Sequence, residues 1–139
     1  MRVILVATVA LLLAVPAGAA SAAAPALTVR DTRYGRILFD GAGRSLYAFT
    51  RDTQHGASRC YRACAAAWPV YYAGGTLRAG RGVAQRLIGT VRRADGRRQV
   101  TYNGWPLYLF SGDSAPGDTN GQGQGGVWYA LDPSGNAIN

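Results

Sequence analysis

The chain has 139 residues and a formal net charge of +8 at pH 7. All fifteen basic residues are Arg and all seven acidic residues are Asp, so the chain has neither Lys nor Glu, and it has one His. The length suits a single domain, and so few acid–base groups disfavour an enzyme. The positive charge favours contact with anionic envelope polymers, whereas no motif indicates a cofactor or a specific nucleic-acid site.

The N-terminal segment is typical of a secretory signal. Arg2 precedes an apolar run from Val3 to Val15, and small residues in the pattern read by signal peptidase follow it. The run is shorter than the about 20 residues that a membrane-spanning helix needs. We therefore expect residues 1–24 to be a signal peptide and 25–139 to be one domain, secreted to the cell exterior or the periplasm. No Cys follows the apolar run, so we expect no lipid anchor.

The rest of the chain predicts a mainly β domain of short strands. Asp-Gly pairs between apolar segments, at Asp40-Gly41 and Asp95-Gly96, predict two β-hairpins, and Asn103-Gly104 predicts a further turn. The segments that we expect to form strands are 37–39, 45–49, 87–91, 99–102, 105–110 and 127–131. Four arginines flank the Asp95-Gly96 turn, namely Arg92, Arg93, Arg97 and Arg98. We expect them at a solvated hairpin tip, with a polyanion site as the alternative.

One segment, 58–68, predicts a short helix. It is rich in Ala, Ser58 can cap its start, and Pro69 cannot continue it. Cys60 and Cys64 lie within it and are the only cysteines. Because export leads to an oxidising compartment, they predict a disulfide.

The same region offers an alternative, a metal site. Asp52, His55, Cys60 and Cys64 would supply a carboxylate, an imidazole and two thiolates within one loop. These ligand types suit zinc or copper. The alternative makes the chain an extracellular metal-binding or redox-related protein.

The Gly-rich segment 117–126 predicts a loop. Asp118 and Asn120 place side-chain oxygens at alternate positions, and Asp113 precedes them, so the three are candidate calcium ligands. A loop of the EF type ends in a bidentate Glu, which this chain lacks. Only a weaker calcium site is therefore compatible with the segment.

Two stretches nearly repeat each other and predict a duplicated unit. LYAFTRD spans 46–52 and LYLFSGD spans 107–113, and Trp68 and Trp128 follow the two copies. We expect repeat one at about 37–72 and repeat two at about 99–131, forming one small domain.

Alternation along a strand puts the Tyr and the Phe of each copy on one face, so Tyr47, Phe49, Tyr108 and Phe110 predict matched aromatic pairs in one core. Asp52 and Asp113 come where each strand ends. At that position a carboxylate caps backbone N–H groups of the following loop, and we expect this structural role rather than catalysis.

Further aromatic residues predict core packing. An alternative is a stacking surface for sugars or other flat ligands. The residues in question are Trp68, Tyr71, Tyr72, Trp105, Trp128 and Tyr129.

Four segments in order resemble a bacterial secreted-repeat family known as lipoprotein 15, whose members carry tandem copies of Tyr, four residues and Asp: LYAFTRD, CYRACAAAWP, VTYNGWPLYLFSGD and PGDTNGQGQGGVWY. The motif positions here are Tyr47 with Asp52, and Tyr108 with Asp113. The resemblance covers about 37–131 and implies a secreted protein of unknown function. Many relatives have an anchoring Cys that this chain lacks, and a position that is often Gly is Arg62, which a positive φ would strain.

These observations predict a secreted, non-catalytic module of the envelope or the extracellular space, structural or ligand-binding. The metal or redox protein is the alternative. An accessory role in the catabolism of alkanes or other apolar carbon sources is a further alternative, implied only by the family resemblance.

Overall fold

The structure is a computed structural model that describes residues 14, 18 and 26–139. The predicted signal peptide lies, apart from two positions, outside the described residues. The strands are β1 (Leu27–Thr32), β2 (Gly35–Asp40), β3 (Tyr47–Phe49), β4 (Ile88–Arg92), β5 (Arg98–Tyr102), β6 (Trp105–Tyr108) and β7 (Trp128–Ala130). The helical elements are α1 (Ala63–Ala67) and the 3₁₀ turns η1 (Gln85–Leu87) and η2 (Gln124–Gly126). Within the described part of the chain, no helix is long and apolar enough to cross a bilayer.

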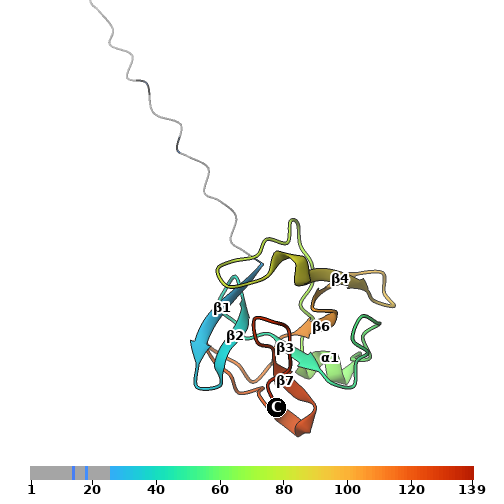
Figure 1. Cartoon of the computed structure of the whole chain (residues 1–139). Coiled ribbons are helices and arrows are strands. Elements are labelled where there is room, and N and C mark those ends of the chain that lie inside the picture. The colour runs from blue at the N-terminus through green and yellow to red at the C-terminus, as the bar shows by residue number, and fades with distance from the viewer. Residues whose placement is uncertain (1–13, 15–17, 19–25) are drawn as a thin grey trace, which may run out of the picture.

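The strands form two antiparallel sheets, which confirms the mainly β prediction. One sheet is the β1–β2 hairpin, and the other has the order β4-β5-β6-β3-β7. The β1–β2 hairpin lies on one side of the molecule and β4 on the other, with β3, β6 and β7 between them (Figure 1). Hydrogen bonds from Leu38 N to Leu131 O and from Leu46 N to Leu38 O join β2 to the chain near β3 and β7.

Each repeat is a hairpin followed by a short strand. The hairpin predicted at Asp95-Gly96 is confirmed. The one predicted at Asp40-Gly41 is wrong: segments 37–39 and 45–49 share only the bridge between Phe39 and Ser45, because β2 pairs with β1 and β3 pairs with β6 and β7. The β1–β2 hairpin precedes β3, and the β4–β5 hairpin precedes β6. The two short strands are neighbours, and Tyr47 lies opposite Tyr108 in their register. Strand β1 was not expected from the sequence; it forms because six of its residues pair in register with β2.

The predicted helix is present but shorter than expected. It begins after Arg62, whose φ of 52° and ψ of −120° belong to the region that favours Gly, so the expected strain at this position is confirmed. Ser58 does not cap the helix, which has no side-chain cap. Its hydroxyl instead lies 2.5 Å from that of Tyr108, because the chain from 58 to 62 is not helical.

The large sheet has a hydrophobic cluster on each face. Tyr47 and Tyr108 pack in one cluster, while their neighbours Ala48 and Leu107 pack in the other, as alternation along a strand requires. The segment 69–73 runs beside β6 and β5, through hydrogen bonds from Leu109 N to Pro69 O and from Val100 N to Tyr71 O. The end of repeat one therefore lies alongside the strands of repeat two.

Candidate functional site

The motif carboxylate of repeat one is buried and meets the tyrosine of repeat two. Asp52 is 5% exposed, and its Oδ2 accepts a 2.6 Å hydrogen bond from the Tyr108 hydroxyl. Its Oδ1 accepts a 2.7 Å hydrogen bond from the backbone N–H of Arg59. The expected capping of the following loop is therefore present, and a bond between the repeats is added to it.

A buried guanidinium completes this group. Arg93 is 4% exposed, and its Nη1 donates to Ser58 Oγ at 2.7 Å and to Gln99 Oε1 at 2.9 Å. Its Nη2 donates to Cys60 O at 2.7 Å. We call Asp52, Tyr108, Ser58 and Arg93 the Asp52 cluster.

The motif carboxylate of repeat two repeats this geometry with the partners exchanged. Asp113 Oδ2 accepts a 2.7 Å hydrogen bond from the Tyr47 hydroxyl, and Oδ1 accepts a 2.8 Å bond from the N–H of Asn120. Gly121 N donates to the Tyr47 hydroxyl oxygen at 3.2 Å. We call these four residues the Asp113 cluster. Asp113 is only half-buried.

The repeats are thus joined crosswise: each tyrosine binds the carboxylate of the other copy. The backbone follows the same exchange, since Thr50 N donates to Val127 O and Ser111 N donates to Ala67 O. An interlocked pair of this kind cannot separate into two folded repeats without breaking buried hydrogen bonds.

Four aromatic rings stack between the two clusters. Trp68 and Trp128 lie parallel with ring centroids 3.9 Å apart, Phe49 stacks on Trp128 at 4.3 Å, and Phe110 stacks on Trp68 at 4.3 Å. Tyr47 is fully buried and meets Trp68 edge-on. The core interpretation holds for these rings, although the two Phe rings at the ends are only half-buried.

Burial decides how the groups of the Asp52 cluster ionise. It raises the pKa of the Asp52 carboxyl, while the hydrogen bond from Tyr108, the N–H of Arg59 and the charge of Arg93 oppose that rise. Burial and the hydrogen bond to Asp52 raise the pKa of Tyr108, and Tyr47 behaves in the same way beside Asp113. Both tyrosines are therefore hydrogen-bond donors at neutral pH.

The disulfide prediction is confirmed, and the four proposed metal ligands are not gathered. Cys60 and Cys64 are bonded to each other, so neither sulfur is a thiolate. The Asp52 carboxylate accepts hydrogen bonds from Tyr108 and Arg59, whereas His55 is exposed, with its ring against Gly104. Among the described residues, no three His, Cys, Asp or Glu side chains come together as a possible metal site.

The candidate calcium ligands accept hydrogen bonds from their own loop. Asp118 Oδ2 accepts from the N–H groups of Ser114 and Ala115, each at 2.9 Å, which lowers its pKa. Asn120 Nδ2 donates to Gly112 O. Asp118 thus binds the chain just before the Gly-rich loop, and Asp113 binds the N–H of Asn120 inside it. The loop is irregular as predicted, apart from the 3₁₀ turn η2.

The prediction that all four arginines lie at a solvated hairpin tip is partly wrong. Arg92, Arg97 and Arg98 are exposed, but Arg93 turns inward, because Ser58, Cys60 and Gln99 offer buried acceptors there. Sequence reasoning missed Ser58, Arg93 and Gln99 as members of a polar core. The one signal in the sequence was Gln99, a polar residue directly before Val100 in a predicted strand.

Acidic side chains are used mainly to close turns. Six of the seven Asp residues accept at least one backbone N–H, namely Asp40, Asp52, Asp95, Asp113, Asp118 and Asp132. Most arginines are exposed. Since the described residues include fourteen Arg and seven Asp, the surface carries an excess of positive charge.

Comparison with known proteins gives one match. The model of a family described as a secreted repeat of unknown function matches residues 28–71 and 89–132, more than half of the chain. The two matched stretches begin within the β1–β2 and β4–β5 hairpins, before the predicted repeat starts at about 37 and 99. They end close to the predicted repeat ends at about 72 and 131. No curated protein and no solved structure matches the chain.

Proposed function

The chain belongs to this family of secreted repeats of unknown function, and from that premise we propose that it is a non-catalytic module that adheres to anionic polymers of the cell envelope. One observation carries the proposal. Six of the seven acidic side chains accept backbone N–H groups, whereas every described arginine except Arg93 is exposed, in a chain with a net charge of +8. Unneutralised positive charge attracts polyanions.

The non-catalytic part of the proposal is supported by how the motif residues are used. Both motif tyrosines donate to carboxylates, and both carboxylates also accept a backbone N–H. Tyr47 and Tyr108 are fully buried. Groups satisfied in this way hold the repeats together and are not free to act as acid, base or nucleophile.

Binding to a polyanion can be tested with purified wall teichoic acid, a polyol phosphate. We expect saturable binding in calorimetry that weakens steeply as salt is raised, because the contact is between exposed charges. A variant in which four exposed arginines become Gln should bind more weakly at every salt concentration. The four positions are Arg51, Arg81, Arg86 and Arg92.

A matched control tests whether the weaker binding results from the loss of positive charge. Asp31→Asn alters an exposed side chain and raises the net charge, so it should not weaken binding. All variants should unfold within about 0.5 kcal/mol of the parent, as surface substitutions do. Binding that is absent, or that the four Gln substitutions leave unchanged, would contradict adhesion to polyanions, and turnover of the polymer would contradict a non-catalytic role.

A further inference from the structure

A groove lies on the surface around Arg44 and reaches Asp113 of the Asp113 cluster. Three hollows of about 330, 230 and 120 Å³ all have Arg44 in their walls. The first two also share Ala42, and the last two share Asp113, so the three are neighbours along one stretch of surface. The largest alone reaches the volume of about 300 Å³ at which small-molecule sites begin.

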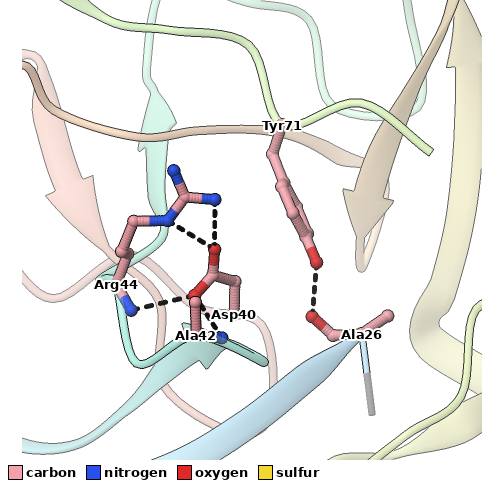
Figure 2. A network of polar contacts seen from close by, with 5 residues as sticks. All are labelled: Ala26, Asp40, Ala42, Arg44 and Tyr71. Carbon is pink, nitrogen blue, oxygen red and sulfur yellow. Dashed lines mark hydrogen bonds and ion pairs between the residues drawn. The ribbon is translucent and has the colours of Figure 1, made fainter. Parts of the chain in front are cut away.

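The two walls of the largest hollow differ in chemistry. One is the ring of Tyr71, whose hydroxyl donates to Ala26 O at 2.6 Å; the other is the ion pair of Arg44 with Asp40, 2.7 Å between Nη2 and Oδ2 (Figure 2). An aromatic ring opposite fixed polar groups is the combination that binds a sugar ring, which has apolar faces and a rim of hydroxyls.

Arg44 is held in place and still has donors to offer. The Asp40 carboxylate accepts from Arg44 Nε at 2.8 Å and from its backbone N–H at 2.9 Å. Nη1 points away from the carboxylate (Figure 2), and the side chain is 53% exposed. Because a guanidinium has five N–H donors, the pair leaves several for a ligand.

The aromatic wall is rigid. Tyr71 N donates to Leu107 O and Tyr71 O accepts from Val100 N, so the backbone is fixed between two strands. The neighbouring Tyr72, also in the wall, has the Arg97 guanidinium 3.4 Å from its ring centre. A wall that needs no ordering on binding reduces the entropic cost of association.

We propose that this groove binds a linear, electrically neutral saccharide chain, with sugar rings against Tyr71 and hydroxyls bonded to Arg44. The groove holds one cation, Arg44, and two carboxylates, Asp40 and Asp113, so it does not favour a polyanion. Its extent beyond one hollow suits a chain of sugars rather than a single one. Saccharide binding in this groove does not depend on the adhesion to polyanions proposed above, and either activity can be present without the other.

The test titrates three hexasaccharides into the protein by calorimetry: cellohexaose, N-acetylchitohexaose and hexagalacturonate. We expect at least one neutral chain to bind with an affinity that salt does not change. Arg44→Ala should weaken that binding about tenfold or more, since a hydrogen bond to a charged group is lost. Ala42→Trp should abolish it by filling the groove, because Ala42 is exposed where two hollows meet.

Two substitutions outside the groove serve as controls. Ala94→Trp adds the same bulk at an exposed hairpin tip, and Arg51→Ala removes an exposed arginine, so both should leave the affinity unchanged. Failure of both neutral chains to bind overturns the proposal, as does binding that survives both groove substitutions. Salt-sensitive binding of hexagalacturonate alone also overturns it, and would leave adhesion to polyanions intact.

Discussion

The Asp52 and Asp113 clusters are copies of one arrangement in two different environments. In both, a tyrosine from the other repeat donates to the carboxylate, and a loop N–H seven residues on donates to its second oxygen. Asp52 is buried, beside the inward-facing Arg93, and a disulfide follows its loop directly. Asp113 is half-buried, and its loop is closed by the Asp118 carboxylate.

The difference shows that two copies of the same hydrogen bonds can contribute unequally to the free energy of unfolding. A charge or hydrogen bond taken out of water is costly to leave unpaired, whereas the same group at the surface can turn to solvent. We therefore expect the Asp52 cluster to dominate stability. Stability variants of the two clusters can break or sharpen this comparison.

The largest difference is expected between arginines at the turns of the two hairpins. Arg93→Leu leaves Ser58, Gln99 and the carbonyl of Cys60 buried without their donor, and should cost about 3 kcal/mol of unfolding free energy. Arg33→Leu, at the turn of the β1–β2 hairpin, alters an exposed side chain and should cost less than about 0.5 kcal/mol. Urea unfolding measures both, and similar costs would refute the special weight of Arg93.

The next difference concerns the motif tyrosines. Tyr108→Phe removes the donor to a carboxylate that is 5% exposed, and should cost about 2–3 kcal/mol. Tyr47→Phe keeps the same ring and removes the donor to half-buried Asp113, so about 1 kcal/mol is expected. The pair is its own control, since each variant loses one hydroxyl. The comparison would be wrong if Tyr47→Phe were the more damaging change in the same urea titration.

Removing the disulfide should make the two loops more alike. The bridge joins residues four apart in the sequence, and by the chain-entropy model its loss costs about 2 kcal/mol. The double variant Cys60→Ala with Cys64→Ala should therefore fold and remain secreted, with a lowered thermal midpoint. Reducing agent should lower the midpoint of the parent by a similar amount and leave the double variant unaffected. A parent that is insensitive to reduction would contradict this account.

The smallest effect is a pH dependence of opposite sign in the two repeats. The raised pKa of Asp52 means that the folded state takes up its proton more readily than the unfolded chain, so this group adds stability as pH falls through that raised pKa toward its usual 3.8. The lowered pKa of Asp118 acts in reverse: its contribution is full above 3.8 and is lost as pH falls through the lowered value.

Stability profiles of Asp52→Asn and Asp118→Asn separate the two contributions. Urea midpoints are measured between about pH 7 and about pH 3. The rise in stability on acidification should disappear in Asp52→Asn, and the fall in stability at the acid end should disappear in Asp118→Asn. A decline that Asp118→Asn leaves in place would assign the acid sensitivity to another carboxylate.

Much of the local structure could be predicted because its signals are local. Asp95-Gly96 and Asn103-Gly104 specify turns between apolar segments, and both turns connect paired strands. The half-buried Phe49 and Phe110 show the limit of such signals: alternation predicted their face correctly, but the exposure of that face depends on what covers the edge of the stack.

The sequence by itself determined a mainly β fold of two repeats, the Cys60–Cys64 bridge and the capping roles of Asp52 and Asp113, because each depends on residues close together in the chain or on an internal repeat. Only the tertiary structure decided which tyrosine meets which carboxylate, since Tyr108 and Asp52 are 56 residues apart and Tyr47 and Asp113 are 66 apart. The antiparallel register that sets Tyr47 opposite Tyr108 makes that choice. The inward turn of Arg93 has the same origin, because its acceptor Cys60 is 33 residues away and becomes a neighbour only when the two repeats interlock.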